Sequence, residues 1–180
     1  MQEIGMHEEI ISPWVTLVAR TVASSPGRKE AVYHSIKQSD YVAVLAVTKD
    51  GEIPLVRQYR PACGMVTLEL PSGLMEVGET PEQCARRELA EEVGLEADEP
   101  HLRRLGVLRP DTGRLENRLW CFFASEARPI RGWQREAAVE PQLVSREQLM
   151  QAIAEGRFDH ALHIAVLGLA VFGGSFKVQV

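Results

Sequence analysis

The segment Gly73–Leu95 constrains the fold of this chain more than any other, because it specifies one helix with a high density of carboxylates. The run Thr80–Gln83 predicts the start of the helix, with threonine as N-cap, proline in the first turn and glutamine at the capping-box position. Gly94 predicts its end, because glycine readily adopts the left-handed conformation that terminates helices. We therefore expect a helix over residues 80–93.

Three glutamates lie within one turn of each other on this predicted helix. Relative to Glu88, Glu92 lies about 40° round the helix axis and Glu91 about 60° in the other direction. Like charges at this spacing destabilise a helix, so the pattern has two interpretations. It is either a solvated acidic face or a site for a divalent metal ion, since hard carboxylate oxygens suit Mg²⁺ or Mn²⁺. Arg87, four residues before Glu91, can partly neutralise the cluster.

The spacing of the whole segment resembles a known family signature. Seven identities and two apolar positions stand in the order Gly73-x5-Glu79-x7-Arg87-Glu88-Leu89-x-Glu91-Glu92-x-Gly94-Leu95, which resembles a complete Nudix box. The resemblance implies an α/β (α+β) domain, the Nudix α/β/α sandwich with a mixed sheet, whose box forms a loop–helix–loop that holds catalytic Mg²⁺. It also implies hydrolysis of a nucleoside diphosphate linked to another moiety.

The resemblance also assigns roles within the box. It implies Glu88 and Glu92 as direct ligands of Mg²⁺, for which Mn²⁺ can substitute, with Glu91 close beside them. The backbone carbonyl of Ser72 is implied as a further ligand, and Arg87 as the residue that orients the carboxylates. This chemistry fits a pyrophosphate, because metal ions neutralise the charge that builds up during attack and lower the pKa of the attacking water.

Two runs near the box resemble the branch of ADP-ribose pyrophosphatases and nucleoside diphosphate sugar hydrolases. They are Arg57–Pro61 on the preceding strand and Glu69–Leu74 leading into the box. In that branch the final arginine of the first run contacts the substrate diphosphate, which maps to Arg60. A guanidinium fork matches phosphate oxygens well. Arg57 is a second candidate, and the alternative for both is an exposed strand residue.

Substrate preference is less constrained. Pro110 stands fifteen positions after Leu95, and a proline near that place marks ADP-ribose specificity in the family; the products would be AMP and ribose 5-phosphate. The run Arg109–Arg114 departs from the Ser-Pro-Gly form common in the branch, which leaves GDP-mannose or another nucleoside diphosphate derivative open. Trp14 can stack on a base, or it can be an ordinary core aromatic.

The branch usually draws its catalytic base, or a further metal ligand, from an acidic loop after the box. The corresponding region, residues 132–140, contains only Glu136 and Glu140 as acids. We expect one of them to act as the base, and Glu140 is the candidate for a further metal ligand. Each can instead be a surface charge.

The remaining chain predicts strands interleaved with two more helices. The strands are expected near residues 14–22, 30–36, 41–47, 53–59, 66–70, 102–108 and 119–124; helices are expected from Ser145 to about Gly156 and over residues 159–172. Residues 1–40 are expected to be an N-terminal β extension that forms a homodimer, as in the branch, and residues 41–180 the Nudix hydrolase domain.

Composition excludes other classes. The formal charge of −5, without a block of basic residues, argues against nonspecific binding to nucleic acid or to an anionic membrane. The longest apolar stretch, Ala161–Phe172, is interrupted by His163 and is too short to span a bilayer. Three isolated cysteines and an N-terminus without a signal-peptide pattern indicate a reduced, cytoplasmic protein.

A different functional class also fits the family. A regulatory Nudix domain would bind a nucleotide sugar without turnover, but such domains often lose box glutamates, and all are present here. His160 and His163 can share a helical face, yet the sequence shows no third ligand beside them, so we expect packed or exposed histidines there.

Overall fold

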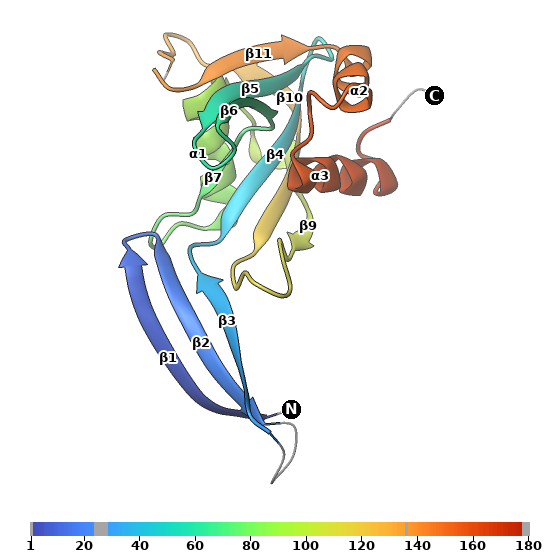
Figure 1. Ribbon diagram of the computed structural model, residues 1–180. Helices are drawn as coiled ribbons and strands as arrows, with labels where there is room; N and C mark the ends of the chain where they lie inside the picture. The colour runs from blue at the N-terminus through green and yellow to red at the C-terminus, as the bar shows by residue number, and fades with distance from the viewer. Residues whose placement is uncertain (1, 24–28, 136, 178–180) are drawn as a thin grey trace. The chain divides into compact units, whose positions relative to one another are not determined.

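Strand β4 (Tyr41–Thr48) is the strand on which the main sheet and its helices are organised (Figure 1). Its run of apolar residues is buried at six successive positions, as expected for a strand covered on both faces. Alternate side chains, from Val42 to Ala46, join the apolar cluster that includes Leu89 of α1 (Pro81–Val93). Helix α3 (Ala161–Phe172) also contacts β4 but contributes nothing to that cluster. The sheet is thus covered by helices on both sides, which confirms the predicted α/β/α architecture.

The strands form three sheets. The main sheet has the order β7-β4-β10-β8, with β9 paired to β10; a second sheet has the order β11-β5-β6, and a third the order β1-β2-β3. The remaining elements are β1 (Gln2–Ser12), β2 (Val15–Ala23), β3 (Ala31–Lys37), β5 (Ile53–Arg60), β6 (Met65–Glu69), β7 (Ser72–Leu74), β8 (Leu95–Glu96), η1 (Glu99–His101), β9 (Leu102–Leu108), β10 (Leu119–Pro129), β11 (Glu140–Val144) and α2 (Arg146–Ala154).

The computed structural model describes residues 2–23, 29–135 and 137–177. The chain divides into two compact units. One consists of Met1–Asp40 with Leu108–Leu119, and the other of Tyr41–Val107 with Trp120–Val180. The second unit contains the box helix α1 and the sheets around it.

The first unit is built on an antiparallel three-stranded sheet. Strand β2 pairs with β1 on one side and with β3 on the other. The loop of residues 108–119 is tied to β3 by a parallel bridge between Ile36 and Leu115. Glu116 of that loop also binds Arg20 and Ser35. The loop that carries Pro110 is therefore an integral part of this unit.

Most predicted elements match the structure within one or two residues. The box helix, β9 and α3 agree closely, whereas β10 continues five residues beyond the expected end. Strand β1 was not predicted individually because its side chains are exposed at almost every position, so it shows no clear alternation of apolar residues. Backbone pairing with β2 holds it in place instead.

Among the described residues, we find no helix with both the length and the apolar character that a membrane span requires.

Candidate active site

Helix α1 begins and ends as its sequence predicts. Thr80 Oγ1 accepts a hydrogen bond from the Gln83 backbone N–H at 3.2 Å, and Gln83 Oε1 accepts one from the Thr80 backbone N–H at 2.8 Å. This capping box satisfies two backbone groups at the helix start. At the other end, Gly94 adopts a left-handed conformation with φ of 65°. These two signals fix which residues lie in the helix and hence which glutamates face the site.

The three box glutamates lie in different environments. The side chains of Glu88 and Glu92 are buried, with residue exposures of 6% and 7%. Glu91 is exposed. Apolar neighbours on the same helix, including Leu89, pack into the core and draw this part of the helix against the sheet. Two carboxylates are therefore held away from water, which is costly unless a cation compensates them.

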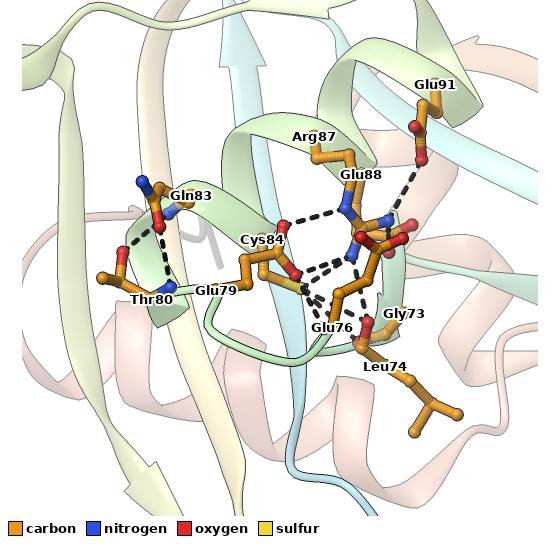
Figure 2. Close-up of polar contacts among 10 residues, drawn as sticks. All are labelled: Gly73, Leu74, Glu76, Glu79, Thr80, Gln83, Cys84, Arg87, Glu88 and Glu91. Atoms are coloured by element: carbon orange, nitrogen blue, oxygen red, sulfur yellow. Dashed lines mark hydrogen bonds and ion pairs between the residues drawn. The ribbon is translucent and has the colours of Figure 1, made fainter. Parts of the chain in front are cut away.

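Arg87 connects the acidic residues of the box (Figure 2). Its Nε and Nη2 atoms donate to the two carboxylate oxygens of Glu79 at 2.8 and 3.0 Å. Its Nη1 atom donates to Glu88 at 2.6 Å and to Glu91 at 3.1 Å, and Nη2 also reaches the Leu74 carbonyl at 3.0 Å. One guanidinium thus orients three carboxylates and ties the preceding loop to the helix.

The pKa values of the carboxylates at the two ends of this network are shifted in opposite directions. The Arg87 hydrogen bond lowers the pKa of Glu79 to about 2, so Glu79 stays ionised. Burial raises the pKa of Glu88 in spite of the nearby Arg87. Glu79 is therefore a fixed counter-ion that positions Arg87, while burial disfavours the charged form of Glu88 more than Arg87 stabilises it.

Glu92 is the second buried carboxylate of the box, and its pKa is strongly raised. Its Oε2 atom accepts a hydrogen bond from the Ser72 backbone N–H at 2.8 Å. Burial nevertheless raises its pKa to about 8, and repulsion from Glu88 adds to the effect. A divalent cation beside these two carboxylates would reverse the electrostatic cost of ionising them.

The glycine of the box motif leaves space for this arrangement. A Cβ atom on Gly73 would collide with the Glu88 carboxylate, so a larger residue would displace it. At the helix end, a side chain on Gly94 would collide with the ring of Trp133. Close approach therefore requires glycine at both positions.

A second arginine–carboxylate pair lies on strands β5 and β6. Arg60 Nε and Nη2 donate to Glu69 at 2.8 and 2.6 Å, and Thr67 Oγ1 donates to the same carboxylate at 2.6 Å. Burial alone would raise the pKa of Glu69, but the hydrogen bonds from Arg60 and Thr67 outweigh it and lower the pKa to about 2. Arg60 remains partly exposed, with 41% of its side chain accessible. It is thus held in a fixed orientation with donor groups still open to a ligand.

Arg57 and Glu140, the other two candidates on this sheet, lie on the face opposite Arg60. Arg57 lies three residues before Arg60 on β5, so in a regular strand the two side chains point to opposite faces. Glu140 of β11 is the direct partner of Arg57, and directly paired residues share a face. Both line an open hollow of about 420 Å³ together with Arg135. The structure brings Arg57 and Glu140 together, but not with Arg60 and Glu69.

The remaining candidates lie elsewhere. Trp14 and Pro110 belong to the first unit, where Trp14 is exposed. Glu136 lies outside the described residues. Their roles stay predictions.

The donor set fits a hard divalent cation. Glu88 and Glu92 offer carboxylate oxygens that are buried and incompletely compensated, and Glu91 adds a third carboxylate at the exposed edge. Mg²⁺ favours oxygen ligands of this kind and keeps positions for water and substrate phosphates. The residues present therefore fit the metal that the box implies.

Two buried polar residues near this site, Glu69 and His163, make contacts that the sequence did not predict. The Glu69 carboxylate, one nitrogen of His160 and one of His163 lie within 4.8 Å of one another. The β5–β6 register pairs Val56 with Glu69 and Arg60 with Met65, so Glu69 and Arg60 lie on the same face of the sheet, four residue pairs apart. No local signal predicts His163, which is 93 residues from its hydrogen-bond partner Leu70.

Comparison with known proteins identifies the family of this fold and site. The model of the NUDIX domain matches residues 37–165. An ADP-ribose pyrophosphatase of Bacillus subtilis (strain 168) is 36% identical over 101 residues, which is 56% of this chain and 54% of that protein. An ADP-sugar pyrophosphatase of Mus musculus is 36% identical over 104 residues, covering 51% of this chain and 47% of that protein. The matched region thus spans about half the length of each relative.

The fold has a similar solved structure. A crystal structure described as an ADP compounds hydrolase superposes with a TM-score of 0.82 at 21% identity, covering 98% of this chain and 96% of that one. This similarity supports the fold.

Proposed function

The chain belongs to the NUDIX domain family, and on this basis we propose that it is a Mg²⁺-dependent pyrophosphatase of nucleoside diphosphate sugars. The observation that carries the proposal is the pair of buried carboxylates, Glu88 and Glu92, whose pKa values are raised by burial. Such a pair is stable in its ionised form when a cation binds to it, which is the requirement of a metal-dependent hydrolase.

The side chains divide the work of the reaction. Glu88, Glu91 and Glu92, with the Ser72 carbonyl, would hold the metal, and Mn²⁺ can replace Mg²⁺. The metal, when bound, supplies positive charge to the diphosphate and acidifies the attacking water. Arg87 keeps the carboxylates oriented through its contacts with Glu79 and Glu88.

Arg60 is the residue we propose for binding the diphosphate. Glu69 fixes its guanidinium through two hydrogen bonds, so little side-chain entropy is lost when a phosphate binds to the exposed donors. Arg57, Pro110 and Trp14 remain further candidates for substrate contact. The base that accepts the proton from water is proposed to be Glu136 or Glu140.

ADP-ribose is the proposed substrate, with AMP and ribose 5-phosphate as products. The names of the Bacillus and mouse relatives support an adenosine diphosphate compound. GDP-mannose or another nucleoside diphosphate derivative is the alternative. A nucleotide-sugar-binding domain without turnover is the remote alternative.

We further propose that the enzyme is a cytoplasmic homodimer, with residues 1–40 forming the dimer and residues 41–180 the hydrolase domain. The exposed apolar side chains of the first unit support this: strand β1 alone exposes Ile4, Met6, Ile10 and Ile11. A second copy of the chain would remove these side chains from water. Sedimentation velocity of the full chain would test the dimer.

A substrate panel tests the proposed activity. Purified protein with Mg²⁺ is assayed by phosphate-coupled turnover with ADP-ribose, GDP-mannose, UDP-glucose, NADH and diadenosine polyphosphates, each repeated in EDTA. We expect the highest kcat/KM on ADP-ribose and no turnover in EDTA. Comparable rates on several sugars would show that the base is hardly recognised. Nucleotide-sugar binding without turnover would contradict the enzyme assignment.

A further inference from the structure

A buried histidine on α3 holds the backbone segment that leads into the box. His163 is 1% exposed, and its Nδ1 atom accepts a hydrogen bond from the Leu70 backbone N–H at 3.0 Å. Leu70 lies between the end of β6 at Glu69 and the start of β7 at Ser72. Its N–H group is buried, and a buried N–H without a partner is costly. His163 supplies that partner from a distant part of the chain.

The segment Glu69–Ser72 carries two contacts of the proposed active site. At one end, Glu69 fixes Arg60 through two hydrogen bonds. At the other end, the Ser72 N–H binds the Glu92 carboxylate. Between them, the Pro71 carbonyl accepts a hydrogen bond from the Val44 N–H at 2.9 Å. Glu69 and Ser72 themselves pair with neighbouring strands. Proline has no N–H of its own, so between these two residues the Leu70 N–H is the backbone donor, and His163 accepts it.

A metal site at Glu69, His160 and His163 would be the other interpretation of this cluster, and two observations oppose it. The lone pair of His163 Nδ1 already accepts the Leu70 N–H, so the proton of the neutral ring lies on Nε2 and neither nitrogen is free to bind a metal. Arg60 already compensates the charge of the Glu69 carboxylate. A metal ion beside Glu69 would therefore add a buried positive charge that no further carboxylate of the cluster compensates. The cluster is therefore better suited to positioning than to coordination.

The ring is also suited to a permanent acceptor role. Burial lowers the pKa of His163 to about 3, with the neighbouring His160 adding to the effect, so the imidazole stays neutral. The two rings stack with centroids 3.9 Å apart and planes 14° apart. His160 thus restricts the rotation of His163 without binding Leu70 itself.

We propose that His163 is a positioning residue of the active site. By accepting the Leu70 N–H, it fixes the segment Glu69–Ser72 and thereby sets both the orientation of Arg60 toward the diphosphate and that of Glu92 toward the metal. This inference rests on the proposed function, but its consequence for metal binding can be measured without substrate.

The test uses two polar replacements that place their acceptor differently. In His163→Asn the amide oxygen can occupy the position of Nδ1, whereas in His163→Gln it extends toward the position of Nε2. Mn²⁺ binding to the substrate-free protein is measured by electron paramagnetic resonance, and KM and kcat are measured on the best substrate of the panel. Hydrogen–deuterium exchange of the peptide containing residues 69–72 reports the anchor directly. His160→Leu serves as the matched control for lost ring stacking.

We expect His163→Gln to weaken Mn²⁺ binding and raise KM by about 10-fold each, the size typical of lost support behind a metal ligand. Exchange of the peptide should become faster. His163→Asn and His160→Leu should stay within about 2-fold of wild type. If His163→Gln is folded and keeps wild-type Mn²⁺ affinity and KM, or if both polar variants behave alike, the proposal is wrong. If the wild-type protein shows no turnover, the proposed function is wrong. The positioning role of His163 is still supported in that case, provided that Mn²⁺ binding to the variants follows the expected pattern.

Discussion

Glu69 and Glu92 are buried to a similar degree, yet their pKa values are shifted in opposite directions. The pKa of Glu69 is lowered to about 2 and that of Glu92 is raised to about 8. Burial disfavours the charge of both. The difference lies in their partners: Glu69 accepts two hydrogen bonds from Arg60 and one from Thr67, whereas Glu92 accepts one backbone hydrogen bond, from Ser72.

This comparison shows how the fold separates a structural carboxylate from a functional one. Glu69 already has its cation, so its role is to orient Arg60. Glu92 accepts a backbone hydrogen bond, and burial raises its pKa, so a bound metal ion would strongly stabilise its charged form.

Replacing Glu92 should produce the largest loss of activity. Glu92→Gln keeps an acceptor for the Ser72 N–H but removes the negative charge, so the fold should persist while turnover falls about 10³-fold, as for loss of a preorganised charge-stabilising group. Steady-state kinetics with saturating Mg²⁺ would measure this. Glu82→Gln, at a partly exposed position in the first turn of the same helix, is the matched control. Full activity of Glu92→Gln would break the assignment of the metal site.

The two carboxylates should also give opposite pH dependences of stability in EDTA. The folded state keeps a proton on Glu92 that the unfolded chain loses, so stability should fall as the pH rises from about 4.5 to 8, with a limiting slope of about 1.4 kcal/mol per pH unit. For Glu69 the contribution is present above pH 4.5 and is lost as the pH falls from 4.5 to about 2.

Urea unfolding at pH 3, 5 and 8 separates these two contributions. Glu92→Gln should reduce the decline between pH 5 and 8, to which Glu88 also contributes. Glu69→Gln should reduce the loss between pH 5 and 3, to which Glu79 and His163 also contribute. An unchanged decline in Glu92→Gln would show that another group is responsible.

A milder change tests whether the geometry of Arg60 matters beyond its charge. Arg60→Lys keeps the charge but cannot donate two parallel hydrogen bonds to Glu69. We expect KM to rise about 10-fold, which corresponds to about 1.4 kcal/mol, with a smaller change in kcat. Arg57→Lys, on the opposite face of β5, should have a smaller effect; equal effects would argue against the facing inferred from the pleat.

The smallest expected effect concerns the third hydrogen bond to Glu69. Thr67→Val keeps the shape of the side chain and removes the hydroxyl, so unfolding should become easier by about 1 kcal/mol. KM should rise less than 2-fold, since Arg60 keeps both hydrogen bonds to Glu69. Thermal unfolding and kinetics measure the two. A rise in KM as large as that of Arg60→Lys would mean that the hydroxyl, and not the ion pair, fixes the arginine.

The part of this site that could be predicted from sequence is the part that is local. The capping residues Thr80 and Gln83 and the terminator Gly94 define α1, and the helical period then places Glu88, Glu91 and Glu92 together. Arg60 was identified by a motif, but its partner Glu69 lies on the next strand and depends on the register of the hairpin. The contact between His163 and Leu70 joins residues 93 positions apart in the sequence. It depends on how α3 packs, which residue spacing does not predict.

Prediction of the fold from the sequence has the same limit. Apolar alternation and turn residues predicted most strands, but not the exposed β1 or the short β7, β8 and β11, which are defined by their pairing with neighbouring strands. Missing β11 had a functional consequence, since its pairing with β5 places Glu140 beside Arg57 and on the face opposite Arg60. Likewise, the sequence did not show which buried carboxylates lack full compensation of their charge. That required the burial and the hydrogen-bond partners of each carboxylate.

The most direct test of the central claim is the release of protons when metal binds. Isothermal titration of Mn²⁺ into the metal-free protein at pH 7, in two buffers of different ionisation enthalpy, counts the protons released. With the pKa of Glu92 at about 8, wild-type protein should release close to one proton from this group, and Glu92→Gln should lack that release and bind Mn²⁺ more weakly. Equal affinity and equal proton release in the two proteins would show that Glu92 is not the carboxylate that receives the metal.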